Sequence, residues 1–277
     1  MRPGPLRVRE DGRMGVPGRP SSLARRRDLV RAVALGVLAG FLSGLFGVGG
    51  GVLIVPGLVL LLSLDQRLAH GTSLAAIVPI AFAGVAGYAV SDSVDWPVAA
   101  CLVVGSSVGA VLGTHALHVL SVRVLAITFA TALLLTAARL FLDVPDVSGR
   151  NPLDVWSIVS LVLLGALAGT LSGLLGVGGG IVMVPGQVLL FSITDAVAKG
   201  TSLAVIIPTA VVGTSRNLRR GNADLRLALV VGVAGVVSGA AASQLSVRMD
   251  ATLSSVLFGV LLVATAARML WSTLRDR

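Results

Sequence analysis

Long apolar runs without charged residues alternate with short polar connections along this chain. Four long runs cover residues 32–64, 96–122, 155–194 and 227–247, and four shorter ones cover 71–91, 124–138, 200–215 and 251–267. Crossing the hydrocarbon core of a bilayer takes roughly 20 apolar residues. Each long run is sufficient for this, and each short run becomes sufficient when its flanking residues are included. The runs are continuous rather than alternating, which predicts spanning helices and not the strands of a barrel.

The pattern occurs twice. Residues 40–62 and 169–191 are identical at 16 of 23 positions, at a constant offset of 129. The same offset aligns AHGTSLAAIVP at 69–79 with AKGTSLAVIIP at 198–208, where 8 of 11 residues are identical. Copies this similar form an internal repeat, and the period is too long for a solenoid. We therefore predict an all-α integral membrane protein with about eight transmembrane segments in two homologous halves.

Polar, proline-rich and glycine-rich stretches set the predicted boundaries. The first 30 residues contain eight arginines, four prolines and four glycines with little apolar periodicity, which is typical of a disordered tail. The predicted units are a basic tail (1–30), a first transmembrane repeat (31–142), a linker (143–154), a second transmembrane repeat (155–272) and a C-terminal tail (273–277). Within the first repeat, the segments after the first run are expected over 70–90, 96–120 and 121–142.

The first apolar run of each half is too long for one straight span. These runs have 33 and 40 residues. As helices they would be roughly 50 and 60 Å long, against a hydrocarbon core of about 30 Å. We expect each first helix to be broken at its glycine-rich motif, Gly47–Gly51 or Gly176–Gly180, just before Pro56 or Pro185. In an alternative arrangement, the glycine-rich segments form re-entrant hairpins and leave six spans in two inverted three-span halves.

Composition and charge agree with a membrane protein. Hydrophobic residues make up 55% of the chain and charged residues 13%, and the mean hydropathy is +0.93. Both arrangements place 18 basic residues on the side of the N-terminal tail and 4 on the other, so charge does not choose between them. The net charge of +9 is interpreted as loops and tail facing anionic lipid, not nucleic acid. The single Cys101 excludes an intramolecular disulfide.

The paired SGxxGxGGGxxxVP stretches, each followed by GTSLxxxxP, resemble the sulfite exporter TauE/SafE family of bacterial membrane proteins. The resemblance covers residues from about 31 to 272. It implies an inner-membrane permease for sulfite, sulfonates, sulfoacetate or related organosulfur anions. The second copy departs from the first where Lys199 replaces His70 and Gln187 replaces Leu58.

The glycine clusters are the first candidate for chemistry. Successive glycines in an unwound segment expose backbone N–H groups, and the following half-helix presents its positive end. Such groups bind an anion inside a bilayer without a buried Lys or Arg. We expect the two clusters to face each other near the mid-plane, although close helix packing by small residues is the other interpretation. The expected site residues are Gly47, Gly49, Gly50, Gly51, Gly176, Gly178, Gly179, Gly180, Ser43 and Ser172.

Polar residues at the GTS motifs are the second candidate. Four hydroxyl residues at segment starts are expected either to cap a helix or to donate to substrate, namely Thr72, Ser73, Thr201 and Ser202. His70 and Lys199 stand at equivalent positions beside them. They either attract an anion at the mouth, with proton coupling through His70, or snorkel to the interface. No carboxylate lies in the middle of an apolar run, so proton coupling through a buried Asp or Glu is not predicted.

Other classes of protein lack their characteristic motifs. GVGGG has neither the lysine nor the strand–helix context of a nucleotide loop. No catalytic constellation or ligand spacing of His, Asp and Glu is present, so we predict neither an enzyme nor a metal or other cofactor. An anion channel, or a membrane subunit with a different small-molecule substrate, is the alternative to a transporter. The predicted partners are a small anion and the lipid bilayer of the bacterial inner (plasma) membrane, and the oligomeric state stays open.

Overall fold

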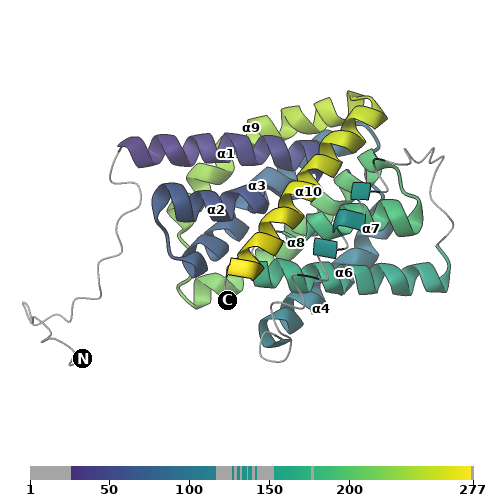
Figure 1. The fold of residues 1–277 in the computed structure, drawn as a ribbon, viewed down its shortest axis with the longest axis horizontal. Coiled ribbons are helices and arrows are strands. Elements are labelled where there is room, and N and C mark those ends of the chain that lie inside the picture. The colour runs from purple at the N-terminus through teal and green to yellow at the C-terminus, as the bar shows by residue number, and fades with distance from the viewer. Residues whose placement is uncertain are drawn as a thin grey trace, which may run out of the picture.

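The computed structural model describes residues 26–116, 153–175 and 178–275, with scattered helical positions between 127 and 141. These residues fold into helices, and no strand occurs among them. The helices are α1 (Arg26–Phe46), α2 (Gly51–Leu62), α3 (Gln66–Ala89), α4 (Trp96–Ala116), α6 (Val155–Leu175), α7 (Gly180–Phe191), α8 (Asp195–Arg219), α9 (Leu225–Arg248) and α10 (Ala251–Arg275), as Figure 1 shows. Five of these helices are long and apolar enough to cross a membrane: α1, α3, α6, α8 and α9. The chain is therefore a multi-pass membrane protein.

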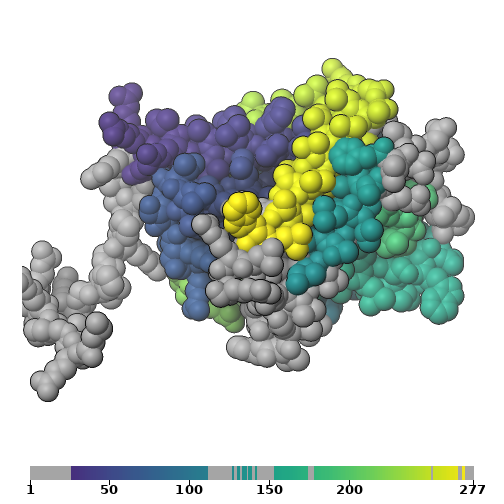
Figure 2. Space-filling model, in the orientation of Figure 1, coloured from purple at the N-terminus to yellow at the C-terminus, as the bar shows by residue number. Residues whose placement is uncertain are grey.

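Large apolar side chains cover the outside of the helices. Leu60 on α2 is 75% exposed, Leu163 on α6 is 64% exposed and Val237 on α9 is 77% exposed. Apolar surface this extensive is unfavourable in water and suits contact with lipid tails. Figure 2 shows α10 lying across one face of the bundle beside α1.

The two halves run in opposite directions. The equivalent helices α3 and α8 pack against each other. Gly84 near the end of α3 lies against Leu203 near the start of α8, whereas Gly213 of α8 lies against Leu74 of α3. Because the two helices are antiparallel, a two-fold axis that relates the halves must run across these helices and not along them.

Each half packs its helices into the other half. α1 of the first half packs along α9 of the second half. In the same way, α6 of the second half packs along α4 of the first half. The closest contacts of α1 come from glycines four residues apart, with Gly36, Gly40 and Gly44 facing Val231, Gly235 and Gly239 of α9. Backbones approach this closely in membranes where small residues line the interface. The two halves therefore form one body rather than two neighbouring domains.

α2 folds back along α1. The Arg31 guanidinium near the start of α1 donates a hydrogen bond to the Leu61 carbonyl at the end of α2 (Nη1 to O, 3.1 Å). Gly57 in the middle of α2 lies against the side chain of Leu35, and the equivalent residues of α6 and α7 make the same contact. Each glycine-rich segment is thus the tip of a hairpin whose two ends lie at the same end of the bundle. This packing favours the re-entrant alternative over a straight span with a break in it.

Two helix starts differ from the sequence predictions. α1 begins at Arg26, inside the range expected to be a disordered tail. α3 begins at Gln66, before the expected start at residue 70, because Asp65 caps it by accepting a hydrogen bond from the backbone of Arg67. The rest of the predicted tail, and most of the predicted linker and fourth segment, lie outside the described residues.

The two ends of the bundle differ in charge. The end where α1, α3 and α9 begin and α8 finishes contains Arg26, Arg27, Arg31, Arg67, Arg216, Arg219, Arg220 and Arg226. The opposite end, where α4, α6, α8 and α10 begin, contains Asp92, Asp95, Asp154, Asp195 and Asp250. The bundle therefore has a basic end and an acidic end.

Candidate functional site

The glycine-rich tips adopt a backbone that glycine alone accepts readily. Gly47, Gly49 and Gly50 have φ angles of 70°, 79° and 73°, and Gly178 and Gly179 have φ angles of 93° and 73°. This left-handed region carries a steric cost for residues with a Cβ. The tips, residues 47–50 and 178–179, are called the glycine loops below. Glycines that serve helix packing, such as those of α1 against α9, are separate from these loop glycines.

The two glycine loops touch each other. A Cβ placed on Gly180, the first residue of α7, would lie 2.6 Å from the Gly47 carbonyl oxygen and 2.7 Å from the Val48 Cα. A Cβ on Gly178 would lie 3.6 Å from the Val48 carbonyl oxygen. Gly176 lies outside the described residues, so its position in the expected site stays a prediction.

The loops meet at half the height of the bundle. A Cβ on Gly49 would lie 3.1 Å from the Ile206 side chain and 3.4 Å from that of Ile77. A Cβ on Gly178 would lie 3.7 Å from each of the same two side chains. Ile77 and Ile206 stand near the middles of α3 and α8. Gly49 and Gly178 therefore lie beside the middle of the central helix pair, and Gly47 lies closer to the start of α8, against Lys199.

Each loop leads into a helix whose first N–H groups are unused. α2 and α7 have Gly50 and Gly179 as their N-caps, and neither helix has a side-chain capping bond. The backbone N–H groups of residues 48–52 and 178–181 donate no hydrogen bond to any residue that the structure describes. Most of these residues are buried. Two positive helix ends with free buried donors therefore converge where the loops meet, which is an arrangement suited to an anion.

Two serines of the repeated motif lie near these donors. Ser43 is fully buried and stands one turn after Ala39, the residue against which Gly50 packs. The Ser43 hydroxyl oxygen has no hydrogen-bond partner among the described residues. Its counterpart Ser172 is 2% exposed. A buried hydroxyl without a partner costs free energy, so Ser43 has donor capacity left for a ligand.

The GTS threonines join the two halves. The Thr72 hydroxyl accepts a hydrogen bond from the backbone N–H of Asp224, the N-cap of α9 (3.0 Å). The Thr201 hydroxyl accepts the equivalent bond from the N–H of Asp95 just before α4 (2.9 Å). These contacts lie at opposite ends of the bundle. Thr72 and Thr201 therefore hold one half to the other and are not brought to the glycine loops.

The GTS serines lie one residue further along. The Ser202 hydroxyl donates to the Gly47 carbonyl (3.0 Å), which ties α8 to the first glycine loop. Ser73 is fully buried and also has a partner. Ser202 is thus one GTS hydroxyl that contacts a glycine loop.

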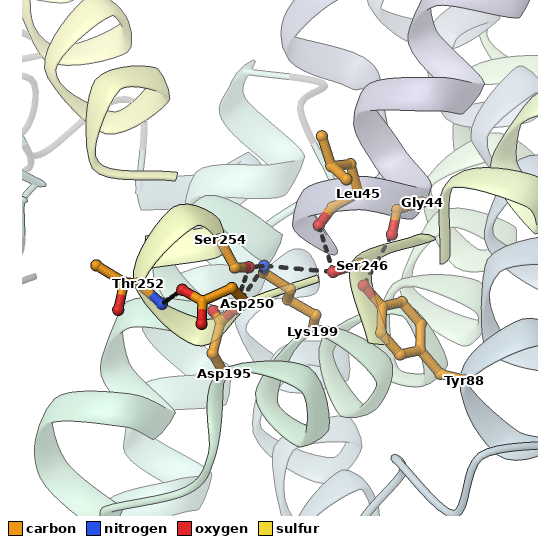
Figure 3. Close-up of polar contacts among 9 residues, drawn as sticks. All are labelled: Gly44, Leu45, Tyr88, Asp195, Lys199, Ser246, Asp250, Thr252 and Ser254. Atoms are coloured by element: carbon orange, nitrogen blue, oxygen red, sulfur yellow. Dashed lines mark hydrogen bonds and ion pairs between the residues drawn. The ribbon is translucent and has the colours of Figure 1, made fainter. Parts of the chain in front are cut away.

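Lys199 does not snorkel. Its side chain is fully buried, and its ammonium lies 2.6 Å from the Asp195 carboxylate, 2.6 Å from the Ser254 hydroxyl and 3.5 Å from the Ser246 hydroxyl (Figure 3). The interfacial interpretation of Lys199 is therefore wrong. His70 occupies the equivalent position at the other end of the bundle, is partly buried, and also has a partner.

The side chains that bind the last carbonyls of α1 inside the bundle were not predicted from the sequence. The last carbonyls of a helix have no intrahelical partner. Here the Tyr88 hydroxyl donates to the Gly44 carbonyl (2.8 Å), and the Ser246 hydroxyl donates to the Leu45 carbonyl (3.0 Å), as Figure 3 shows. The sequence signal for Asp195 was its spacing of four residues from Lys199, which pairs side chains on one helix face. Tyr88 and Ser246 had no such signal.

Two pockets open near the acidic end. One of about 370 Å³ has Asp92, Asp95 and Trp96 in its wall, and one of about 320 Å³ has Asp154 and Trp156. Neither is lined by a glycine-loop residue. Within the described residues, no three His, Cys, Asp or Glu side chains lie close enough together to hold a metal ion.

Comparison with known proteins places the chain in a family. The model of the sulfite exporter TauE/SafE family matches residues 6–140 and 161–277. The chain therefore belongs to the sulfite exporter TauE/SafE family, as the repeated motifs indicated.

Two relatives extend the comparison. A probable membrane transporter protein, YunE of Bacillus subtilis (strain 168), is 26% identical over 227 residues, which cover 74% of this chain and 83% of that protein. A probable membrane transporter protein of Xylella fastidiosa (strain 9a5c) is 25% identical over 252 residues, covering 88% of this chain and 96% of that protein. The family is thus one of membrane transporters.

Proposed function

We propose that this chain is a secondary transporter that moves small anions by alternating access, with the anion held between the two glycine loops. The observation that carries the proposal is the convergence of the α2 and α7 N-termini, where the N–H groups of residues 48–52 and 178–181 donate to no residue that the structure describes. In a low-dielectric interior such donors hold negative charge without a formal cation beside it.

The direction of the halves supports alternating access. Transporters built from inverted repeats bind substrate near the mid-plane at the repeat interface, in helices interrupted at matching positions. Here α3 and α8 are antiparallel, and the loops meet beside Ile77 and Ile206 at the middle of that pair. Burial of the loop residues means that an anion reaches them only when one end of the bundle opens.

The hairpins support a count of six spans with two re-entrant segments, rather than eight spans. In this topology the N-terminal tail and the linker lie on opposite sides of the membrane. The basic end of the bundle, where α1 begins, then faces the cytoplasm by the positive-inside rule. The acidic end, where α6 begins, faces outward.

The chemistry of the site and the family name both support an anionic sulfur compound as the substrate. The loop N–H groups and the Ser43 hydroxyl can donate hydrogen bonds, so they favour a ligand that has several acceptor atoms and a negative charge. The oxygens of sulfite, sulfonates and other organosulfur anions provide this, and the family to which the chain belongs is named for sulfite export.

Flux measurements in proteoliposomes test the proposal. Purified protein is reconstituted, and uptake of sulfite, sulfoacetate, taurine, sulfate and thiosulfate is followed as the external concentration rises. Uptake of at least one anion that saturates supports a transporter. A rate that rises linearly without saturation indicates the channel alternative, and no movement of any anion by folded protein contradicts the proposed substrate class.

A further inference from the structure

Lys199 and Asp195 form a charged pair beside the first glycine loop. Lys199 contacts the loop, and Asp195 lies one helical turn earlier on α8. A Cβ placed on Gly47 would lie 2.6 Å from the Lys199 Cα and 2.7 Å from its Cβ, so the loop rests on the backbone of this lysine. Ser202, three residues later on α8, donates to the Gly47 carbonyl. Movement of the loop and movement of this part of α8 are therefore mechanically linked.

The pair is closely surrounded. The Lys199 ammonium is 5.8 Å from the ring centroid of Phe46 and 5.7 Å from that of Phe258. Ser254 accepts from Lys199 and donates to the Asp195 carboxylate (2.7 Å), which closes a triangle of contacts. Within the described residues, Asp195 is the sole carboxylate paired with Lys199. A buried charge is tolerated only while it has such a counter-ion.

The other titratable groups facing the pair are already engaged. Tyr88 of α3 donates its hydroxyl to the Gly44 carbonyl. Asp250, just before α10, accepts from the backbone N–H groups of Thr252 and Leu253. The Lys199 side chain also contacts Phe46 of α1, Ser246 of α9, and Ser254 and Phe258 of α10. One oxygen of Asp195, Oδ1, is buried without a hydrogen-bond partner among the described residues.

The first half has no such pair. The positions equivalent to Asp195 and Lys199 are Gln66 and His70, and Gln66 has no charge to offer. Since the halves are inverted, the charged pair lies at the acidic end of the bundle and the Gln–His pair at the basic end.

We infer that Asp195 and Lys199 couple anion transport to a proton. This rests on the proposed function: an anion leaving or entering the glycine loops replaces Asp195 as the counter-ion of Lys199. Asp195, whose side chain is 18% exposed and whose Oδ1 is buried, has then lost its cation, and it binds one proton. The step is balanced, because the pair plus one anion and one proton gives the lysine–anion pair plus a neutral Asp195. Release of the anion returns the proton, so both cross in the same direction.

The test compares wild-type protein with Asp195→Asn and Asp195→Glu in proteoliposomes. The probes are sulfoacetate, sulfate and thiosulfate, whose charges do not change near neutral pH, and the one that wild-type protein moves fastest is used. With the membrane potential clamped at zero, one proton per anion drives a roughly tenfold accumulation at a pH gradient of about one unit. Anion exchange at equal pH on both sides is measured in parallel.

Asp195→Asn is expected to retain measurable anion exchange, at a lower rate because Lys199 has lost its resting counter-ion, but to accumulate no anion, and Asp195→Glu is expected to accumulate normally. Accumulation by Asp195→Asn that equals wild type overturns the inference. So does the loss of both exchange and accumulation in folded Asp195→Asn protein, because Asp195 would then serve binding alone. If wild-type protein moves none of the probes, the proposed function itself is contradicted, and this result is distinct from a failure of proton coupling alone.

A second measurement does not depend on the variant folding. A pH-sensitive dye trapped inside wild-type proteoliposomes should report acidification of the lumen during inward anion flux. Anion flux with an unchanged lumen pH also overturns the inference.

Discussion

The contact between the glycine loops predicts a specific effect of one added methyl group. In Gly180→Ala, the new Cβ would lie 2.6 Å from the Gly47 carbonyl oxygen, where ordinary contact begins at 3.4 Å. The neighbour is backbone of the opposite loop, so it has no flexible side chain to move aside. Gly180 has no left-handed φ, and the perturbation is therefore steric and not conformational.

The size of the effect follows from the distances. Lengthening the contact between the new Cβ and the Gly47 carbonyl oxygen from 2.6 to 3.4 Å displaces the first donors of α7 by most of an ångström, which breaks a hydrogen bond of ordinary length. A hydrogen bond to a charged group contributes about 1.5–3 kcal/mol. Loss of one such bond weakens anion binding roughly 10- to 100-fold. Overpacking also lowers the free energy of unfolding by about 1–3 kcal/mol.

The assay is anion flux in proteoliposomes at concentrations below saturation, with thermal unfolding as the check on folding. Gly239→Ala is the matched control, because it is also a helical glycine between the halves and its new Cβ would meet nothing closer than 3.4 Å. We expect flux to fall in Gly180→Ala and to stay near wild type in Gly239→Ala. Wild-type flux in folded Gly180→Ala would refute the assignment of the anion to the loops.

Three further predictions concern topology and the hydroxyl groups. A tag inserted at Gly149 in the linker should be labelled from outside intact cells, and labelling only after permeabilisation would favour eight spans. Thr72→Val and Thr201→Val should each lower the free energy of unfolding by about 1–3 kcal/mol, because each leaves an N–H of Asp224 or Asp95 without its acceptor. The two effects should add, since the sites lie at opposite ends, and strong coupling in the double variant would contradict this. Ser43→Ala should leave stability unchanged or higher but reduce flux, and unchanged flux would remove Ser43 from the site.

The two copies of the repeat share their local backbone geometry. Gly50 and Gly179 are both N-caps with a φ of 73°, and Ser63 and Ser192 are both left-handed C-caps with a φ of 53°. Identical sequence in identical surroundings produces the same turn twice. The contact between the two glycine clusters was also expected from their matched positions.

The direction of α2 was not predictable from the same residues. A glycine cluster shows where a helix ends, but the path after it is set by tertiary contacts such as Gly57 against Leu35 and Arg31 to the Leu61 carbonyl. Those contacts connect residues remote from the cluster. Arginine counts were equal for both topologies, so hydropathy and charge together left the choice open.

The burial of Lys199 was missed for a different reason. A single lysine near the end of an apolar run is most simply placed at the interface. Its burial depends on Ser246 and Ser254, which come from α9 and α10 and have no periodic relation to it in the sequence. The Asp195–Lys199 spacing was visible, but Asp195 was assigned to a connection rather than to the first turn of α8.

The most direct test of the central claim is to locate the anion. Selenate has the shape and charge of sulfate, and its selenium scatters X-rays anomalously, so a structure of the protein crystallised with selenate would show its position. The account predicts a peak between the two glycine loops, within hydrogen-bond distance of backbone N–H groups in residues 48–52 and 178–181. Selenate bound only at the arginine-rich end, with none at the loops of folded protein, would contradict it.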